Sequence, residues 1–222
     1  MNFKRSPLLV AFSASLIIIA SLAAGCATTA PDLIANPSFM RMNEHAPDSF
    51  EVEFETSAGT FAMRLYRDWS PLGVDRAFYL FENNFHEGAR FYRVVENFVA
   101  QFGGSGEPRI DSLWRTMPIP DEPVRANNAR GTLAYARAGA RSRSYTFYIN
   151  LKDNFALDTN DGAEGVVGFP PIGRVVRGMD VVDSLYSAYA NTPMRTDLSA
   201  VVLARDYPRL DSIAATRVTE TW

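Results

Sequence analysis

Apolar and polar residues alternate without a break over residues 50–55, with phenylalanine and valine on one face and glutamate on the other. Such alternation predicts a strand with one buried face and an acidic outer face. The turn-forming pair Ala58-Gly59 follows, and the alternation resumes over residues 61–65. Residues 50–66 therefore predict a β-hairpin.

The apolar spacing then changes from two residues to three or four, which predicts a helix. Ser70 followed by Pro71 is typical of a helix start. The apolar stripe that follows consists of Val74, Ala77, Phe78 and Phe81. A second helix is predicted over residues 179–189, and residues 103–130, rich in glycine and proline, predict irregular structure. Short strands are predicted over residues 90–95, 97–102, 131–136, 145–150, 172–176 and 212–219.

Many short strands and two separated helices favour one mainly β domain over repeated strand–helix–strand units. We therefore expect residues 48–222 to form a closed antiparallel β-barrel capped by helices. Roughly 170 residues are enough to bury one substantial hydrophobic core. The many aromatic side chains of this region are expected to fill the interior of the barrel.

The first residues have the pattern of an export signal. Lys4 and Arg5 precede an apolar stretch of about 15 residues, which is short for a membrane span. The stretch ends in Leu-Ala-Ala-Gly-Cys at Cys26 and resembles the lipobox of bacterial lipoproteins. The resemblance implies that residues 1–25 are a lipoprotein signal peptide and that a lipid on Cys26 holds the chain on the outer membrane, facing the periplasm. An ordinary signal peptide with an incidental cysteine is the alternative.

Residues 26–47 predict a flexible tether between this anchor and the domain. The segment contains Pro31, Pro37 and Pro47 among small and polar residues, and proline disfavours regular structure in the residues around it. His45 lies in this segment and is expected to be solvated.

Composition excludes several functional classes. The chain of 222 residues has a net charge of −3, which gives no sign of binding to nucleic acid. One cysteine and two histidines exclude an intrachain disulfide and a cysteine zinc cluster and disfavour other metal sites. The sequence has no GxSxG, P-loop or HExxH motif, and we expect neither a metal nor a cofactor. His86 follows a predicted helix end and is expected in a surface loop.

Four blocks of the sequence together resemble one known protein family. Residues 91–104 read FYRVVENFVAQFGG and resemble the signature segment of the cyclophilins, a family of peptidyl-prolyl isomerases. Three further blocks match the family in order and spacing: GTLAYAR at 131–137, TFYINLKDN at 146–154 and IGRVVRGMDVVD at 172–183. The resemblance covers about residues 50–190 and implies an eight-stranded antiparallel barrel capped by two helices.

The resemblance also implies a monomeric domain with a site that binds proline-containing polypeptides. It makes Arg93 the catalytic arginine, with Phe98 and Gln101 beside it. Residues matching the family's substrate-binding positions are Val99, Ala136, Arg137, Thr146, Tyr148, Leu157 and Phe169. The family more often has methionine, asparagine, glutamine, phenylalanine and histidine at 99, 137, 146, 148 and 169, so this pocket is altered.

Isomerisation of an X-Pro bond needs no nucleophile, metal or general base. The barrier of about 20 kcal/mol arises from lost amide resonance. A donor aimed at the imide nitrogen stabilises the twisted transition state, and arginine is suited to that task. Strand alternation would put Phe98 and Gln101 on opposite faces, so the resemblance requires a bend or bulge between them.

Three functions remain compatible with the sequence. The first is a lipid-anchored isomerase that assists the folding of exported proteins. The second is a catalytically weak module or envelope scaffold that recognises proline-containing segments, which the altered pocket residues motivate. The third is a barrel that binds a small apolar ligand.

Overall fold

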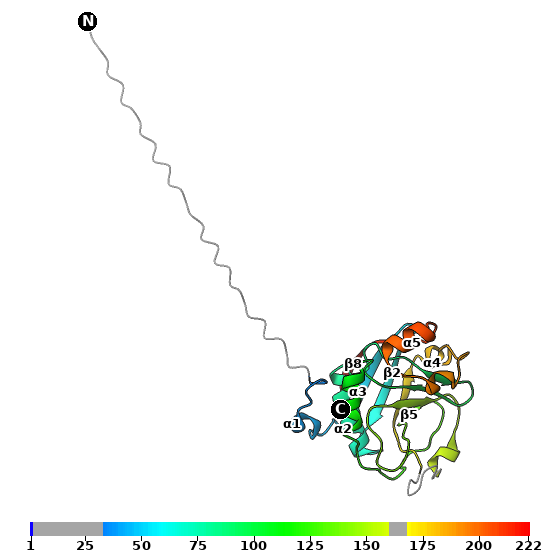
Figure 1. The fold of residues 1–222 in the computed structure, drawn as a ribbon. Coiled ribbons are helices and arrows are strands. Elements are labelled where there is room, and N and C mark those ends of the chain that lie inside the picture. The colour runs from blue at the N-terminus through cyan, green and yellow to red at the C-terminus, as the bar shows by residue number, and fades with distance from the viewer. Residues whose placement is uncertain (2–32, 160–167) are drawn as a thin grey trace. The chain divides into compact units, whose positions relative to one another are not determined.

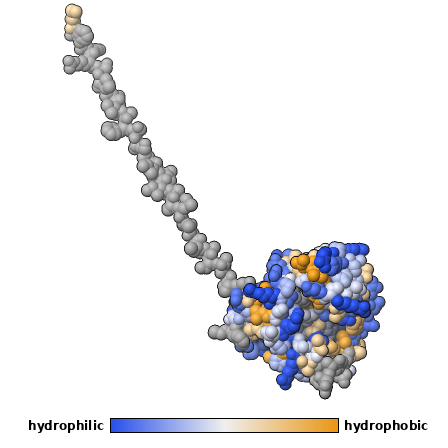
Figure 2. Space-filling view, in the orientation of Figure 1, coloured by the Kyte–Doolittle hydropathy of each residue, from blue (hydrophilic) through white to orange (hydrophobic). Residues whose placement is uncertain are grey.

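A computed structural model describes residues 33–159 and 168–222, together with Met1. The rest of the predicted signal peptide and Cys26 lie outside the described residues. Among the described residues, no helix has both the length and the apolar character needed to cross a membrane. The side drawn in Figure 2 is mostly hydrophilic, with separate apolar patches.

Eight strands form one antiparallel sheet in the order β3-β4-β6-β5-β7-β2-β1-β8 (Figure 1). Their bounds are β1 Ser49–Thr56, β2 Gly59–Tyr66, β3 Arg93–Val95, β4 Val99–Phe102, β5 Thr132–Tyr135, β6 Phe147–Asn150, β7 Pro171–Arg177 and β8 Ile213–Thr221. The predicted hairpin is confirmed as β1 and β2, which pair from Ser49 opposite Tyr66 to Thr56 opposite Gly59.

The sheet curves into a barrel that is closed less completely than the sequence predicts. The end strands β3 and β8 have no ladder with each other. Instead, residues 88–91, which precede β3, and residues 211–213, at the start of β8, exchange three backbone hydrogen bonds, from Gly88 to Ile213, from Ile213 to Ala89 and from Phe91 to Asp211. The prediction of eight antiparallel strands is confirmed, and closure is limited to this short contact.

Aromatic rings fill the interior between the sheet and α2 (Pro71–Glu82). Phe54 stacks on Phe61 at 4.8 Å between centroids and meets Phe81 and Phe102 edge-on. Phe147 lies 5.3 Å from Phe81 on the other side. These side chains are buried, so the interior is packed with rings, as the composition predicts.

Helix α2 begins at Pro71 as predicted, but a distant carboxylate caps it. Ser70 makes no side-chain hydrogen bond to the helix, and its hydroxyl donates to Glu122 instead. Glu122 accepts from the amides of Leu72 and Gly73 at 2.8 and 3.0 Å. A negative charge at this helix end satisfies two amides that otherwise have no intrahelical partner.

The remaining helices are short (Figure 1). They are α1 Phe39–Met42, α3 Pro108–Arg115, α4 Met179–Asp183 and α5 Ala200–Asp206, with 3-10 turns η1 Phe155–Asp158 and η2 Thr192–Arg195. The sequence predicts neither α3 nor α5. It also predicts a helix over 179–189, which is wrong beyond 183: the Tyr186 amide donates to the Asp211 carboxylate at 2.8 Å rather than to a helical carbonyl.

Residues 33–47, predicted as part of a flexible tether, pack against α2 and α3. The Tyr79 hydroxyl donates to the carbonyl of Leu33 at 2.9 Å, and the Trp114 indole donates to that of Ile34 at 2.9 Å. The Ala46 amide donates to Asp75 at 2.9 Å. Hydrogen bonds to buried aromatic side chains hold this stretch in place, which the proline content alone does not reveal.

His86 is fully buried, so its expected place on the surface is wrong. Its ring packs among Phe81, Phe85, Phe102 and Phe147. Its Nε2 lies 2.9 Å from the carbonyl oxygen of Tyr145, an acceptor, so Nε2 carries the proton of the neutral ring. Burial lowers the pKa of His86 to about 4, because the charged ring loses its hydration.

This burial predicts an acid-sensitive component of stability. Between pH 6.5 and about 4 the unfolded chain takes up a proton at His86 that the folded chain refuses, so stability falls as the pH drops through this window. The full effect is about 3 kcal/mol. Lowering the pH from 7.5 to 4 should therefore reduce the free energy of unfolding of the wild type by about 3 kcal/mol more than that of His86→Leu, as measured by denaturant unfolding. A constant difference between the two proteins would contradict this expectation.

Candidate functional site

The β3–β4 hairpin sets the first part of the site. Its turn has Asn97 in the left-handed region, at φ 54°, and the Phe98 amide donates to the Val95 carbonyl at 3.0 Å. Phe98 therefore lies in the turn, and β4 begins one residue later. The resemblance requires a bend or bulge between Phe98 and Gln101, and this turn supplies the bend. In the ladder that follows, Arg93 pairs with Gln101.

The register continues across the neighbouring strands. Gln101 pairs with Tyr148 of β6, and Tyr148 pairs with Ala134 of β5. Arg93, Gln101 and Tyr148 thus form one row across three strands. A cavity of about 200 Å³ opens over this row. Its lining consists of Arg93, Phe98, Val99, Gln101, Ala136, Arg137, Tyr148, Leu157, Phe169 and Met194.

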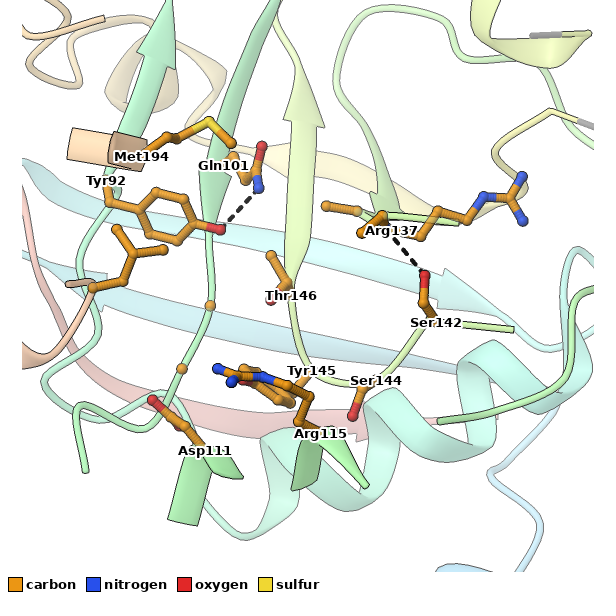
Figure 3. A pocket seen from close by; sticks show the side chains of 15 residues that line it. Tyr92, Gln101, Asp111, Arg115, Arg137, Ser142, Ser144, Tyr145, Thr146 and Met194 are labelled. Atoms are coloured by element: carbon orange, nitrogen blue, oxygen red, sulfur yellow. Dashed lines mark hydrogen bonds between the residues drawn. The ribbon is translucent and has the colours of Figure 1, made fainter. Parts of the chain in front are cut away.

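This small cavity brings together all the predicted site residues of the barrel except Thr146. Thr146 instead lines a neighbouring larger cavity of about 550 Å³. The two cavities share Gln101, Ala136, Arg137 and Met194. In Figure 3, Met194 and Gln101 lie with Tyr92 on one side of the larger cavity, and Asp111 and Arg115 lie on another.

Arg93 is held from two sides at the edge of the small cavity. Its Nη1 donates to Oε1 of Gln101 at 3.1 Å, and its Nε donates to Oδ1 of Asn191 at 2.6 Å. Its guanidinium carbon lies 5.3 Å from the centre of the Phe98 ring. Burial lowers the pKa of Arg93, and Tyr92 opposes that shift. Because the pKa of an arginine side chain ordinarily lies far above neutral pH, the side chain keeps its charge at neutral pH.

Gln101 is itself fixed at both ends. While Oε1 accepts from Arg93, Nε2 donates to the Tyr92 hydroxyl at 2.8 Å. Burial raises the pKa of Tyr92 to about 12, so this hydroxyl stays neutral. Asn191, Tyr92 and Met194 are therefore parts of the site that the sequence prediction omits. Asn191 and Met194 lie outside the four matching blocks, and no local pattern marks them.

Tyr148 carries a hydroxyl at a position where the family more often has phenylalanine. The structure directs this hydroxyl to Oδ1 of Asn128, at 2.9 Å, where it is buried. Burial raises the pKa of Tyr148 well above its usual value. The ring therefore presents an apolar surface to the cavity, while its polar end is satisfied behind the wall.

Phe169 and Arg137 form one edge of the cavity. The Arg137 guanidinium carbon lies 4.7 Å from the centre of the Phe169 ring, and Nη1 donates to Asp121 at 2.9 Å. Only 2% of the Arg137 side chain is exposed. Burial lowers its pKa, with Asp121 opposing the shift. This arginine therefore supports the aromatic edge rather than reaching into solvent.

The backbone amide of Ala136 already has a hydrogen-bond partner within the protein. It donates to the Thr146 carbonyl at 2.9 Å, so an added peptide strand cannot use this donor. In the part of the chain that the structure describes, no three His, Cys, Asp or Glu side chains gather as a metal site. The chemistry available at the cavity is that of a held guanidinium next to an apolar recess.

Comparison with known proteins gives a consistent result. Residues 51–204 match the family model described as "Cyclophilin type peptidyl-prolyl cis-trans isomerase/CLD". A peptidyl-prolyl cis-trans isomerase of Acinetobacter baylyi is 34% identical over 157 residues, which cover 70% of this chain and 79% of the relative. Peptidyl-prolyl cis-trans isomerase B of Escherichia coli is 33% identical over 136 residues, covering 60% and 82%.

Among solved structures, a Cryptosporidium parvum cyclophilin type isomerase has a similar fold. The TM-score is 0.58 at 14% sequence identity, and the match covers 78% of this chain and 99% of that one. At this identity the likeness concerns the fold alone.

Gly168 precedes Phe169 in a tightly packed segment, and we expect its replacement to destabilise the fold strongly. Its φ is +64°, and a Cβ there would collide with the carbonyl of Asp158 and lie 2.6 Å from Val124. We expect Gly168→Ala to lower the free energy of unfolding by more than about 3 kcal/mol. Gly88→Ala is the matched control, because Gly88 has φ +77° and open space around the added carbon. It should cost only about 1 kcal/mol in denaturant unfolding, and equal losses would refute the role of the close contact.

Proposed function

Since the chain belongs to the cyclophilin family of peptidyl-prolyl cis-trans isomerases, we propose that the small cavity is its active site and that its substrates are exported proteins. The observation that carries the proposal is the position of Arg93. A guanidinium fixed by Gln101 and Asn191 lies beside an apolar recess of about 200 Å³.

The recess fits the grip on a proline ring. Its apolar walls come from the rings of Phe98, Tyr148 and Phe169 and from Val99 and Leu157. Burying the ring removes apolar surface from water and holds the proline while the preceding acyl group rotates. This contact is similar in both isomers, so it contributes binding more than rate.

Arg93 supplies the part of the interaction that is specific to the transition state. As the C–N bond twists, amide resonance is lost and the imide nitrogen becomes a hydrogen-bond acceptor. Among the described residues, Nη2 of Arg93 has no hydrogen-bond partner, whereas Nε and Nη1 are engaged. A donor already oriented by two neighbours needs little reorganisation when that acceptor appears.

The N-terminal sequence supports a proposal about the place of action. We propose that a lipid on Cys26 anchors the chain to the outer membrane, where the domain faces the periplasm and meets exported polypeptides. The positively charged start, the short apolar stretch and the small residues before the only cysteine support this proposal.

Replacing Arg93 should remove most of the activity without unfolding the domain. We expect Arg93→Ala to lower kcat/KM for an X-Pro test peptide by roughly 100-fold, as for the loss of one preorganised donor. The loss should appear mainly in kcat, because the apolar grip remains. The measurement is a protease-coupled or NMR exchange assay on the domain, with circular dichroism as the test of folding.

Arg174→Ala is the matched control. Arg174 is an exposed arginine on β7 whose side chain makes no hydrogen bond or ion pair with the described residues, and its loss should leave kcat/KM unchanged. A wild-type chain that binds proline peptides but accelerates nothing would instead support the non-catalytic binding module. Full activity in Arg93→Ala would reject the role of this guanidinium.

Membrane attachment has a separate test. In a bacterial host, Cys26→Ser should move the full chain from the membrane fraction to the soluble periplasmic fraction or leave its signal uncut, because the acceptor of the lipid is gone. Mass spectrometry of the wild type should show the added acyl mass on Cys26. A mature wild-type chain without this mass would contradict lipid anchoring.

A further inference from the structure

Asn128 lies behind the small cavity, outside every motif that identifies the site. We infer that it is the positioning residue of the proline-binding wall, holding the side chains that grip the ring without contacting the substrate itself. The inference rests on the proposed function of the cavity and deepens it, because it assigns the cavity's shape to one buried amide.

The hydrogen bonds of Asn128 use its full capacity. Its Nδ2 donates to Asp158 and to the Phe169 carbonyl, both at 2.8 Å. Its Oδ1 accepts from the Tyr148 hydroxyl at 2.9 Å and from Asn150 at 3.1 Å. The residue is completely buried, so each of these bonds would be costly to lose. Such a saturated amide has one orientation and transmits it to its partners.

Those partners belong to three walls of the cavity. Tyr148 is one wall directly, and the carbonyl of Phe169 fixes the second. The third wall is Leu157, which precedes Asp158. Its backbone amide donates to the Asn154 carbonyl. The Phe169 amide in turn donates to the Leu157 carbonyl at 2.8 Å, so the second and third walls are joined.

A second asparagine extends the same network to Phe98. Asn154 donates its side-chain amide to the Phe98 carbonyl and to Oδ1 of Asn150, at 2.8 and 2.7 Å. The Asn150 side-chain amide donates to Oδ1 of Asn128, and the Asn154 backbone amide donates to the Asn128 carbonyl at 2.8 Å. Phe98 is thus connected to Asn128 through two buried asparagines. Arg93 is held separately, by Gln101 and Asn191.

This separation has a kinetic consequence. A wall that grips the proline ring alike in both isomers affects the binding of substrate and transition state equally. Loosening it should raise KM and leave kcat nearly unchanged, whereas loss of Arg93 should act on kcat. A residue that merely stabilised the whole fold would change the amount of active protein and would not produce this split.

The experiment compares Asn128→Ala with Asn127→Ala, the same substitution at the adjacent exposed position. We expect Asn128→Ala to raise KM for an X-Pro peptide by at least about fivefold, with kcat within about twofold of the wild type. Asn127→Ala should change neither value. An unchanged KM in folded Asn128→Ala, or a loss confined to kcat, would overturn the inference.

A second variant covers the case in which Asn128→Ala does not fold. Asn128→Ala leaves the Tyr148 hydroxyl buried without its acceptor, and Tyr148→Phe removes that hydroxyl. Adding Tyr148→Phe should restore folding while KM stays raised. If the double variant also fails to fold, Asn128 serves the whole domain and the inference is wrong.

Failure of the proposed function can be told apart from failure of this inference. If the wild type shows no isomerisation, the proposed function is rejected. The affinity of the same peptide, measured by titration calorimetry, then tests Asn128 alone. A weakened affinity in Asn128→Ala but not in Asn127→Ala supports positioning, and equal affinities refute it.

Discussion

The register across β3, β4, β6 and β5 is the constraint on which the site depends. Because Arg93 stands opposite Gln101, and Gln101 opposite Tyr148, a cation, an amide and an aromatic ring lie in one row on one face. A shift of one residue would turn each of them to the opposite face. The left-handed Asn97 fixes this register at the hairpin turn and lifts Phe98 out of the strand to close the recess.

Hydrogen bonds and ion pairs behind its walls give the apolar recess its shape. Asn128 holds the walls from behind, and a separate network lies at the aromatic edge, where Asp121 pairs with Arg137. The neighbouring Glu122 joins buried Arg143 to the start of α2 at 2.9 and 3.0 Å. The site is therefore connected to the main helix through charges, each of which has an opposite partner. Unpaired, these buried groups would be strongly destabilising.

Local patterns predicted much of the fold, because the β1–β2 hairpin and the stripe of α2 have a clear period. They missed α3, although Ile110, Leu113 and Trp114 have helical spacing, because this short helix lies in a stretch whose glycines and prolines predict irregular structure. They also misplaced His86, whose burial depends on rings from distant strands. In the candidate site, the family motif predicted Arg93 and the neighbours that line the small cavity with it. Asn191 escaped because its hydrogen bond to Arg93 spans 98 positions, a distance no local pattern encodes.

The position of β1 gives the proposed attachment through the N-terminus a mechanical consequence. β1 lies between β2 and β8, and the backbone of Ser49 exchanges two hydrogen bonds with Trp222. Tension on the preceding segment would first detach residues 33–47, which are held by scattered hydrogen bonds to Tyr79, Trp114 and Asp75 and by no ladder. Force directed along β1 would then load its two antiparallel ladders in shear, where many hydrogen bonds must break together. Residues 33–47 would therefore detach at a lower force than the one needed to separate β1 from its two neighbours.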